Sequence, residues 1–340
     1  MMIAIRVMYF PFVKIPISSK KVWGKISMMS TTFQPAYLNL LQTGELEKRV
    51  TEAYEHLSNC DVCAQTCHVD RRAGELGLCR TGEKARVSNY GPHLGEEDPL
   101  RGTRGSGTIF FTRCNLQCQY CQNADISQTG SGREVEPQDL ANIMLELQKR
   151  GCHNINFVSP SHVGPQILAG VLIAARAGLQ IPLVYNTGGY DSKTMLKLLG
   201  GVIDIYMPDM KYADSEIAER YSKISDYAKI NQAAVKEMHR QVGDLQLDEK
   251  QIATRGLLVR HLILPANLAG TDKIVQFLAA EVSTNTYLNL MDQYRPAYRA
   301  HLYPQLNRAI TPAEYKTAIE MAGNAGLKRL DQRRSLEWWL

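Results

Sequence analysis

Residues 108–125 read TIFFTRCNLQCQYCQNAD, a short apolar run followed by three cysteines within eight positions. The run TIFFT (108–112) has the composition of a buried β-strand. Cys114, Cys118 and Cys121 follow it, separated by three and then two residues. Three thiols this close together are typical of a zinc knuckle, of half a disulfide scaffold, or of an iron–sulfur ligand set. Because tetrahedral metals and four-iron clusters need four ligands, the odd number leaves one ligand to be explained.

From this run onward, strand patterns and helix patterns alternate almost to the end of the chain. The predicted strands cover residues 108–112, 155–159, 182–187, 202–209, 256–264 and 286–291. Helix patterns with apolar residues at three- and four-residue steps separate them, and the one between the fourth and fifth strands is a single long helical stretch that ends at about Asp244. Nearly continuous apolar strands in β-then-α order predict an α/β fold with a parallel sheet covered by helices. Six units are too few for a closed eight-stranded barrel and suit a partial (β/α)6 barrel.

The three cysteines follow the first predicted strand, at the end of the sheet where such folds bind ligands. A zinc site would need a fourth protein ligand and usually pairs two CxxC units. Three cysteines on one loop can instead each bind one iron of a cubane cluster. The fourth iron is then open to a ligand from outside the protein.

Four more cysteines, Cys60, Cys63, Cys67 and Cys79, lie upstream in CDVCAQTCHVDRRAGELGLC (60–79). They form a complete ligand set, so a structural zinc ion or a second, fully ligated 4Fe-4S cluster fits them. Their unpaired spacing favours the cluster, and a redox dithiol is a third interpretation. Cys152 stands alone and is expected to be a buried thiol.

Length, charge and cysteine usage limit the class of protein. A chain of 340 residues with 44 % apolar content can bury one large core or two smaller ones. Clustered cysteines in a chain of this size predict metal binding in a reducing compartment, and hence a cytoplasmic protein. The five Lys and Arg of residues 1–30, a segment without Asp or Glu, account for the whole net charge of +5, so the rest of the chain is formally neutral. No basic face for nucleic acid follows from the total.

The chain divides into four predicted parts. Residues 1–30 are expected to be a disordered basic leader, or an over-extended start, and their apolar run VMYFPFV is too short to span a membrane. Residues 31–87 are predicted to hold a helix and the cysteine-rich metal-binding segment. Residues 88–106, rich in Gly, Pro and charge, are predicted to be a linker. Residues 107–330 form the predicted barrel.

The CxxxCxxC spacing, with Tyr120 before the last cysteine and a strand before the first, resembles the radical S-adenosylmethionine superfamily. NYGPHLGEEDPLRGTRGSGTIFFTRCNLQCQYCQN, NFVSPSH, YMPDMKY and GLLVRHLILP are similar to its branch of pyruvate formate-lyase activating enzymes, especially relatives with an extra cysteine-rich segment. The resemblance covers about residues 34–330. It implies a 4Fe-4S cluster on Cys114, Cys118 and Cys121 whose open iron binds S-adenosylmethionine, with Tyr120 beside the cofactor. Reductive cleavage then gives a 5′-deoxyadenosyl radical that abstracts a hydrogen atom.

The resemblance also implies partners. A low-potential electron donor such as flavodoxin or ferredoxin would reduce the cluster, and a glycyl radical enzyme is the first candidate for activation. The first alternative is radical catalysis on a small molecule or another macromolecule, which an N-terminal segment closing the barrel mouth would favour. The second is a non-catalytic metal-binding or electron-transfer protein. The family's auxiliary clusters add weight to an upstream cluster.

Residues at the ends of the second and third strands are implied to bind the cofactor. Where activating enzymes have a Gly-Gly-Glu turn for its amino group, this chain has Ser159, Pro160, Ser161 and His162. Their hydroxyl and imidazole groups are expected to replace that turn. Asn186, at the end of the third strand, is expected to bind the ribose or only to form a turn.

The fourth and fifth strands contribute charged residues. Asp209 and Lys211 resemble an Asp-x-Lys pair that lies near the methionine part of the cofactor, where the lysine offers a point charge and the aspartate holds it. A surface salt bridge is the alternative. Arg260 and His261 are neighbours in a strand, so only one of them points into the barrel. A buried arginine needs an anion, and Arg260 is expected to face the cofactor, or else to pair with a core carboxylate.

Overall fold

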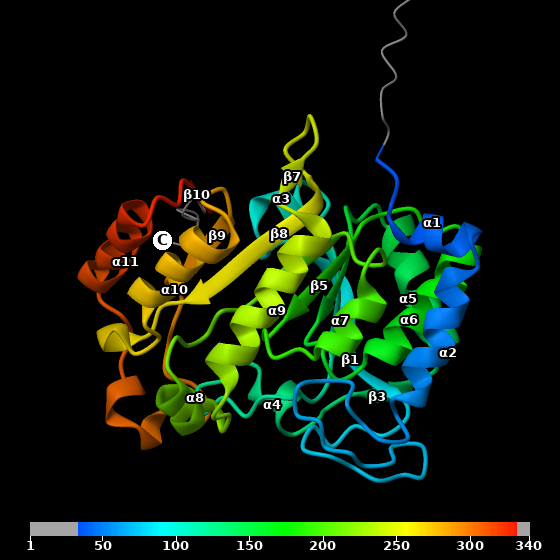
Figure 1. Ribbon diagram of the computed structural model, residues 1–340, viewed down its shortest axis with the longest axis horizontal. Coiled ribbons are helices and arrows are strands. Elements are labelled where there is room, and N and C mark those ends of the chain that lie inside the picture. Colours follow the sequence, from blue (N-terminus) through cyan, green and yellow to red (C-terminus); the bar gives the residue numbers. More distant parts are fainter. Residues whose placement is uncertain (1–32, 332–340) are drawn as a thin grey trace, which may run out of the picture. The chain divides into compact units, whose positions relative to one another are not determined.

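A largely parallel sheet forms the centre of the protein in this computed structural model, which describes residues 33–331. Its strand order in the described chain is β10-β9-β8-β6-β5-β4-β2-β1-β3 (Figure 1). The six predicted strands are present as β2 (Ser106–Phe111), β4 (Ile155–Val158), β5 (Leu183–Thr187), β6 (Ile205–Pro208), β8 (Ala253–Leu262) and β9 (Tyr287–Met291). Each runs parallel to its neighbour among these six. The expected leader, residues 1–30, lies outside the described residues.

The sheet is extended at both edges by strands that the sequence did not predict. β1 (Ala85–His93) pairs antiparallel with β2 and with β3 (Arg133–Val135). β10 (Arg329–Leu330) pairs with β9, and β7 (Gln246–Leu247) pairs with β8. Because the strand order ends at β10 and β3 without pairing them, the sheet in the described residues stays open. The fold is therefore a mixed α/β partial barrel, as predicted.

The predicted linker at residues 88–106 is wrong, because it contains most of β1 and the short helix α3 (Asp98–Arg101). Leu100 of α3 is fully buried with Val184 and Leu258 against one face of the sheet. Tyr185 and Leu257, the neighbours of these two strand residues, face the opposite core. This alternation is expected for strands buried on both faces. The segment therefore fills the inner face of the barrel.

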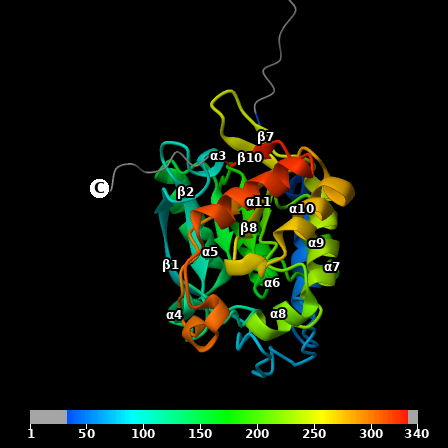
Figure 2. The same ribbon diagram turned by 90° about the vertical axis from the view of Figure 1, so that its left-hand side faces the viewer.

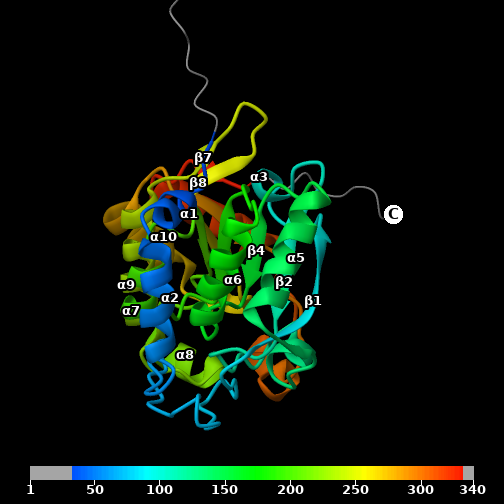
Figure 3. The same ribbon diagram turned by 90° about the vertical axis from the view of Figure 1, so that its right-hand side faces the viewer.

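Helices cover the outer face of the sheet. They are α1 (Tyr37–Gln42), α2 (Glu45–Glu55), α5 (Pro137–Lys149), α6 (Gly164–Arg176), α7 (Lys193–Leu199), α9 (Tyr227–Val242), α10 (Thr271–Phe277) and α11 (Pro312–Asn324), whereas α8 (Ser215–Ser222) packs on α9 at the carboxyl ends of the strands. α5 packs on β2 and β4, and α2 packs on α6 (Figure 3). α10 and α11 pack on each other beside β8 (Figure 2). None of the helices in residues 33–331 has the length and apolar content to cross a membrane.

One long helix was predicted between the fourth and fifth strands, and two are present instead. α8 ends at Ser222 because Lys223 adopts a left-handed backbone conformation, with φ of 62°. α9 begins four residues later, at Tyr227. The break turns the end of α8 toward the cysteine loop that follows β2, where the backbone carbonyl of Ser222 accepts from the amide of Gln117 (3.3 Å).

Candidate active site

The loop that follows β2 carries Cys114, Cys118 and Cys121 into a buried cluster at the carboxyl end of the sheet. The amide of Gln119 donates to the carbonyl oxygen of Tyr221 (2.8 Å), so the end of α8 holds this loop. Tyr120 is buried, and its ring packs against Tyr212 and Tyr294 at centroid distances of 6.4 and 5.8 Å. The side chain predicted to flank the cofactor is thus also part of an aromatic core.

Each of the three sulfurs has a hydrogen-bond donor nearby. The amide of Leu116 donates to Cys114 Sγ (3.4 Å), and the hydroxyl of Ser222 donates to Cys118 Sγ (3.0 Å). The hydroxyl of Ser127, in α4 (Ala124–Ser127), lies 3.1 Å from Cys121 Sγ. Burial and the neighbouring Cys118 raise the pKa of Cys114 to about 12. Three soft thiols, each supplied with a donor, fit an iron–sulfur cluster.

Asp209 and Lys211 follow β6 and lie beside the cysteine loop. Lys211 Nζ is 2.5 Å from Asp209 Oδ2, and both side chains are about four-fifths buried. The salt bridge that was the alternative is thus present, but it is largely buried and not at the surface, and a contact of this pair with the cofactor stays a prediction. Burial alone would lower the pKa of Lys211, but Asp209 and Cys118 outweigh it and hold that pKa well above its usual range. A buried, permanently charged ammonium is thus available next to the three thiols.

The turn after β4 uses its side chains mainly inside the protein. Ser159 has φ of 58°, the left-handed conformation that a glycine would adopt easily. The hydroxyl of Ser161 lies 2.8 Å from that of Thr187, and His162 Nε2 lies 3.0 Å from the carbonyl oxygen of Thr112. Burial and then Arg71 lower the pKa of His162 to about 4, so its ring is neutral at pH 7. Only Ser159 of the three predicted side chains is partly exposed.

The end of β5 holds one predicted residue and one that was missed. Asn186 is 8 % exposed, and its carbonyl oxygen accepts from the amide of Ser159 (2.9 Å). This bond joins the turn after β4 to β5. Asp191, which was not predicted, is buried and accepts from Thr187 Oγ1 (2.7 Å) and Tyr185 Oη (3.2 Å). Its signal in the sequence was weak, because YNTGGYD reads as an ordinary turn.

Arg260 points into the barrel as predicted, on the same face as Leu258. Its guanidinium forms salt bridges with Glu96 and Glu97, and Asn289 donates to Glu97 (2.6 Å). Burial alone would raise the pKa of Glu96, but Arg260 and then His93 outweigh it and lower that pKa to about 2. The structure thus shows the core carboxylate pair that was the alternative, and a cofactor contact of Arg260 stays a prediction.

The upstream cysteines form a second group. Cys60, Cys63 and Cys79 are buried and Cys67 is partly exposed. Burial and then Cys79 raise the pKa of Cys63. Within residues 33–331, no three or more His, Cys, Asp or Glu side chains are arranged to hold a metal ion. This finding applies to Cys114, Cys118 and Cys121 as well, so a metal group at either set of cysteines stays a prediction that rests on donor chemistry.

A buried arginine lies against this second group. Arg71 is 2 % exposed and donates to the carbonyl oxygens of Gly82 (2.9 and 2.7 Å) and His162 (2.8 Å). Its Nη1 is 3.9 Å from Cys60 Sγ. The two carbonyls are neutral, so the Cys60 thiol is the group among these contacts that can become an anion. Sequence reasoning missed Arg71, because VDRRAG reads as a solvated turn.

The cysteine-rich segment, the pale blue loops after α2 in Figure 1, lies at the carboxyl ends of the strands. Cys63 forms an isolated antiparallel bridge with Asp191, and Ser192 Oγ donates to the carbonyl oxygen of Val62 (3.1 Å). Gln65 Nε2 donates to the carbonyl oxygen of Asn115 (2.6 Å), the residue that follows Cys114 in the cysteine loop after β2. The two cysteine groups are therefore joined by direct contacts.

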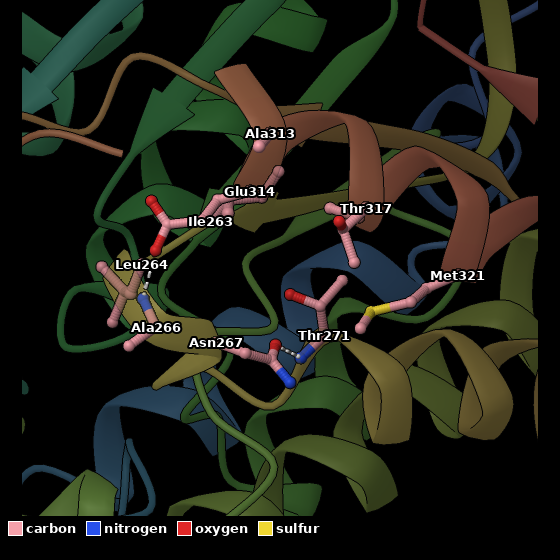
Figure 4. A pocket seen from close by; sticks show the side chains of 10 residues that line it. Ile263, Leu264, Ala266, Asn267, Thr271, Ala313, Glu314, Thr317 and Met321 are labelled. Carbon is pink, nitrogen blue, oxygen red and sulfur yellow. Dashed lines mark hydrogen bonds between the residues drawn. The ribbon is translucent and has the colours of Figure 1, made fainter. Parts of the chain in front are cut away.

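A cavity of about 260 Å³ lies between α11 and the turn after β8 (Figure 4). Leu264, Asn267, Glu314 and Met321 are among its lining residues. Leu264 also packs in the buried cluster that contains Cys118. None of the predicted site residues lines the cavity.

Comparison with known sequences identifies the class of protein that this fold and site define. Residues 108–264 match the sequence model of the Radical SAM superfamily. Over 310 residues the chain is 32 % identical to an uncharacterized protein of Methanocaldococcus jannaschii, covering 89 % of this chain and 85 % of that protein. The chain belongs to the radical SAM superfamily, whose members use a 4Fe-4S cluster and S-adenosylmethionine.

Three solved structures give weaker similarities. A radical SAM methyltransferase from Sphaerobacter thermophilus has a TM-score of 0.47 at 10 % identity, covering 68 % of this chain and 67 % of that chain. A methylornithine synthase has a TM-score of 0.43 at 12 % identity, covering 91 % and 89 %. A domain of a pyruvate-formate lyase-activating enzyme from Bacteroides vulgatus has a TM-score of 0.33 at 12 % identity, covering 56 % and 88 %.

Proposed function

We propose that the protein is an enzyme that reductively cleaves S-adenosylmethionine at a 4Fe-4S cluster held by Cys114, Cys118 and Cys121. The observation that carries the proposal is the set of three thiols, one buried and two partly buried, each with a hydrogen-bond donor, at the carboxyl end of a parallel sheet. When bound, the cluster supplies one electron to the sulfonium, which releases methionine and a 5′-deoxyadenosyl radical.

The chain's own residues would orient the cofactor. Lys211 offers a fixed positive charge for the carboxylate of S-adenosylmethionine, and Asp209 holds the ammonium group of Lys211 in place. Ser159 is partly exposed at the end of β4 and is available to the amino group. Asn186, beside it on β5, is the candidate for the ribose hydroxyls. The tyrosine-rich walls around Tyr120 exclude water from the radical.

The packing of the cysteine-rich segment favours one class of substrate. Gln65 and Cys63 contact the catalytic loop and the turn after β5, so part of the barrel mouth is already covered. A glycyl radical enzyme would have to insert a loop of its own backbone there. We therefore propose a small molecule, or a macromolecule presenting a short group, in preference to activation of a glycyl radical enzyme. A low-potential donor such as flavodoxin or ferredoxin would supply the electron.

Cys60, Cys63, Cys67 and Cys79 are proposed to bind a second metal group, with an iron–sulfur cluster favoured over zinc. Four thiols complete a ligand set, and in a cubane each thiolate binds a different iron, so the sulfurs need not surround one point. A metal held by four thiolates is anionic, and the buried cation of Arg71 next to Cys60 offsets such a charge.

The central test is anaerobic reconstitution of the full chain with iron and sulfide, followed by dithionite and S-adenosylmethionine. We expect 5′-deoxyadenosine and methionine in equal amounts from the wild type. Cys114→Ala should lower the rate at least about a hundredfold, because it removes a cluster ligand. Cys152→Ala is the matched control, since Cys152 is a buried thiol in the main core. Equal product from wild type and Cys114→Ala would contradict the proposal.

Metal analysis of the same samples tests the second group. The wild type should hold about eight irons per chain, and Cys60→Ala about four. About four irons with one zinc would replace the second cluster by a structural zinc ion. Four irons without zinc in the wild type would reject a metal at this group altogether.

A further inference from the structure

The end of α8 reaches a sulfur of the catalytic loop through a buried chain of hydroxyl groups. Ser222 Oγ lies 3.0 Å from Cys118 Sγ and 2.7 Å from Tyr212 Oη. Ser222 is 0 % exposed and Tyr212 is 1 % exposed, so water does not compete for these bonds. A serine hydroxyl carries one hydrogen, which Ser222 donates to the sulfur. Tyr212 therefore donates its own hydrogen to Ser222.

A second serine has the same arrangement at Cys121. Gln128 Nε2 donates to Ser127 Oγ (3.1 Å), which leaves the hydroxyl hydrogen of Ser127 directed to Cys121 Sγ (3.1 Å). In both cases a donor behind the serine fixes the direction in which the serine donates. The pattern occurs at two sulfurs of the loop, and the two serines are contributed by α8 and α4.

Hydrogen bonds of this kind affect the reduction potential of a cluster. Reduction adds one negative charge, part of which resides on the thiolate sulfurs. A donor aimed at a sulfur stabilises the more negative state more strongly, so it makes reduction easier. The effect is largest where water is excluded, because the bond is not screened.

We propose that Ser222, oriented by Tyr212, is a positioning residue that raises the reduction potential of the cluster on Cys118, and that Ser127 acts in the same way at Cys121. The inference rests on the proposed function, because it requires the cluster. The end of α8 then helps to set the reduction potential of the cluster, and hence how easily S-adenosylmethionine is reduced. The sequence pattern had predicted this segment as part of one longer helix.

The test is a redox titration of the reconstituted full chain without S-adenosylmethionine, followed by visible absorbance and electron paramagnetic resonance. Ser222→Ala should lower the equilibrium constant for one-electron reduction by about threefold to tenfold, the larger value being about 59 mV. Ser222→Thr keeps the hydroxyl and should restore the wild-type potential. Ser215→Ala, at an exposed position of the same helix, is the matched control and should change nothing.

Tyr212→Phe provides a second variant in case Ser222→Ala fails to take up iron. It removes the donor behind Ser222 and should shift the potential in the same direction by a smaller amount. An unchanged potential in both variants, with iron content equal to wild type, would overturn the inference while leaving the proposed function intact. Absence of any cluster in the wild type would instead contradict the proposed function.

Discussion

Single residues decide which charges the barrel interior can tolerate. Arg260 lies between Glu96 and Glu97, and the three side chains are at least four-fifths buried. A charge buried in this way is stable only while its partners remain. Lys211 and Asp209 form a second buried pair next to it, since Asp209 forms a parallel bridge with Arg260, and the cofactor is proposed to bind on their side. Arg260 and its two carboxylates thus stabilise the core, and the ammonium group of Lys211 is available to a bound ligand.

Arg260→Met should lower the free energy of unfolding by about 3–5 kcal/mol, because it leaves two buried carboxylates unpaired. Chemical denaturation of the full chain measures this loss. Glu97→Gln added to Arg260→Met should recover part of it, since one of the unpaired charges is removed. If Arg260 serves only the core, the affinity of the folded variant for S-adenosylmethionine will match wild type. A loss of affinity without loss of stability would instead support the contact with the cofactor expected from the sequence.

At the residue scale, the sequence predicted three candidate cluster ligands but not the side chains that surround them. Cys114, Cys118 and Cys121 lie on one loop, so their spacing alone indicated a shared metal group. Ser222 reaches Cys118 across 104 positions of sequence, and no local pattern marks such a contact. The same holds for Arg71, whose contact with His162 spans 91 positions. Donors and counter-charges that meet only through the fold could not be predicted from one sequence.

At the scale of elements, the strands buried on both faces were predicted and the others were not. β4, β5 and β6 read as apolar runs because helices cover one face and the barrel interior lies against the other. β1 is the second strand from the edge and pairs with β3 only through Ala85–Val87, so most of its later residues are partly or fully exposed, and its Gly91 and Pro92 look like loop residues. The break at Lys223 leaves no trace in helix periodicity, because lysine ordinarily favours a helix.

Ser192 joins two elements and provides a test of their contact. Its hydroxyl accepts from the amide of Met195 at the start of α7 and donates to Val62 of the cysteine-rich segment. Ser192→Ala should therefore lower the free energy of unfolding by about 1–3 kcal/mol and speed hydrogen exchange in residues 60–67.

Thr311→Ala is the matched control for that experiment. Thr311 caps α11 by the same hydrogen bond, from the amide of Glu314 to its hydroxyl. It is expected to lower stability to a similar degree while leaving exchange in residues 60–67 at the wild-type rate. Equal exchange in this segment for both variants would show that Ser192 does not hold it.

At the scale of the whole molecule, two buried histidines link stability to pH. Burial lowers the pKa of His162 and of His261 to about 4, whereas an unfolded chain has a histidine pKa of about 6.5. Between these values the unfolded state binds protons that the folded state does not. Stability is therefore full above pH 6.5 and falls as the pH drops toward 4, by roughly 3 kcal/mol for each histidine at most.

Urea unfolding at pH 7 and pH 4.5 measures this dependence. His261→Gln should show a smaller fall between the two pH values, because one of the two titrating groups is gone. The variant keeps an amide that can bond to Met210 and Thr271, the partners of the imidazole. An undiminished fall in the variant would assign the pH dependence to other groups.

The contact of Val62 with Ser192 has a consequence for how the protein is made. The two residues are 130 positions apart, so the cysteine-rich segment leaves the ribosome long before the turn against which it packs. At about 5–20 residues per second, several seconds separate the two events. During that interval Cys60, Cys63, Cys67 and Cys79 lack their protein surroundings and are exposed to oxidants and to competing ions. On the proposal that these four thiols bind a metal group, expression in cells short of iron should give protein with an underfilled upstream group.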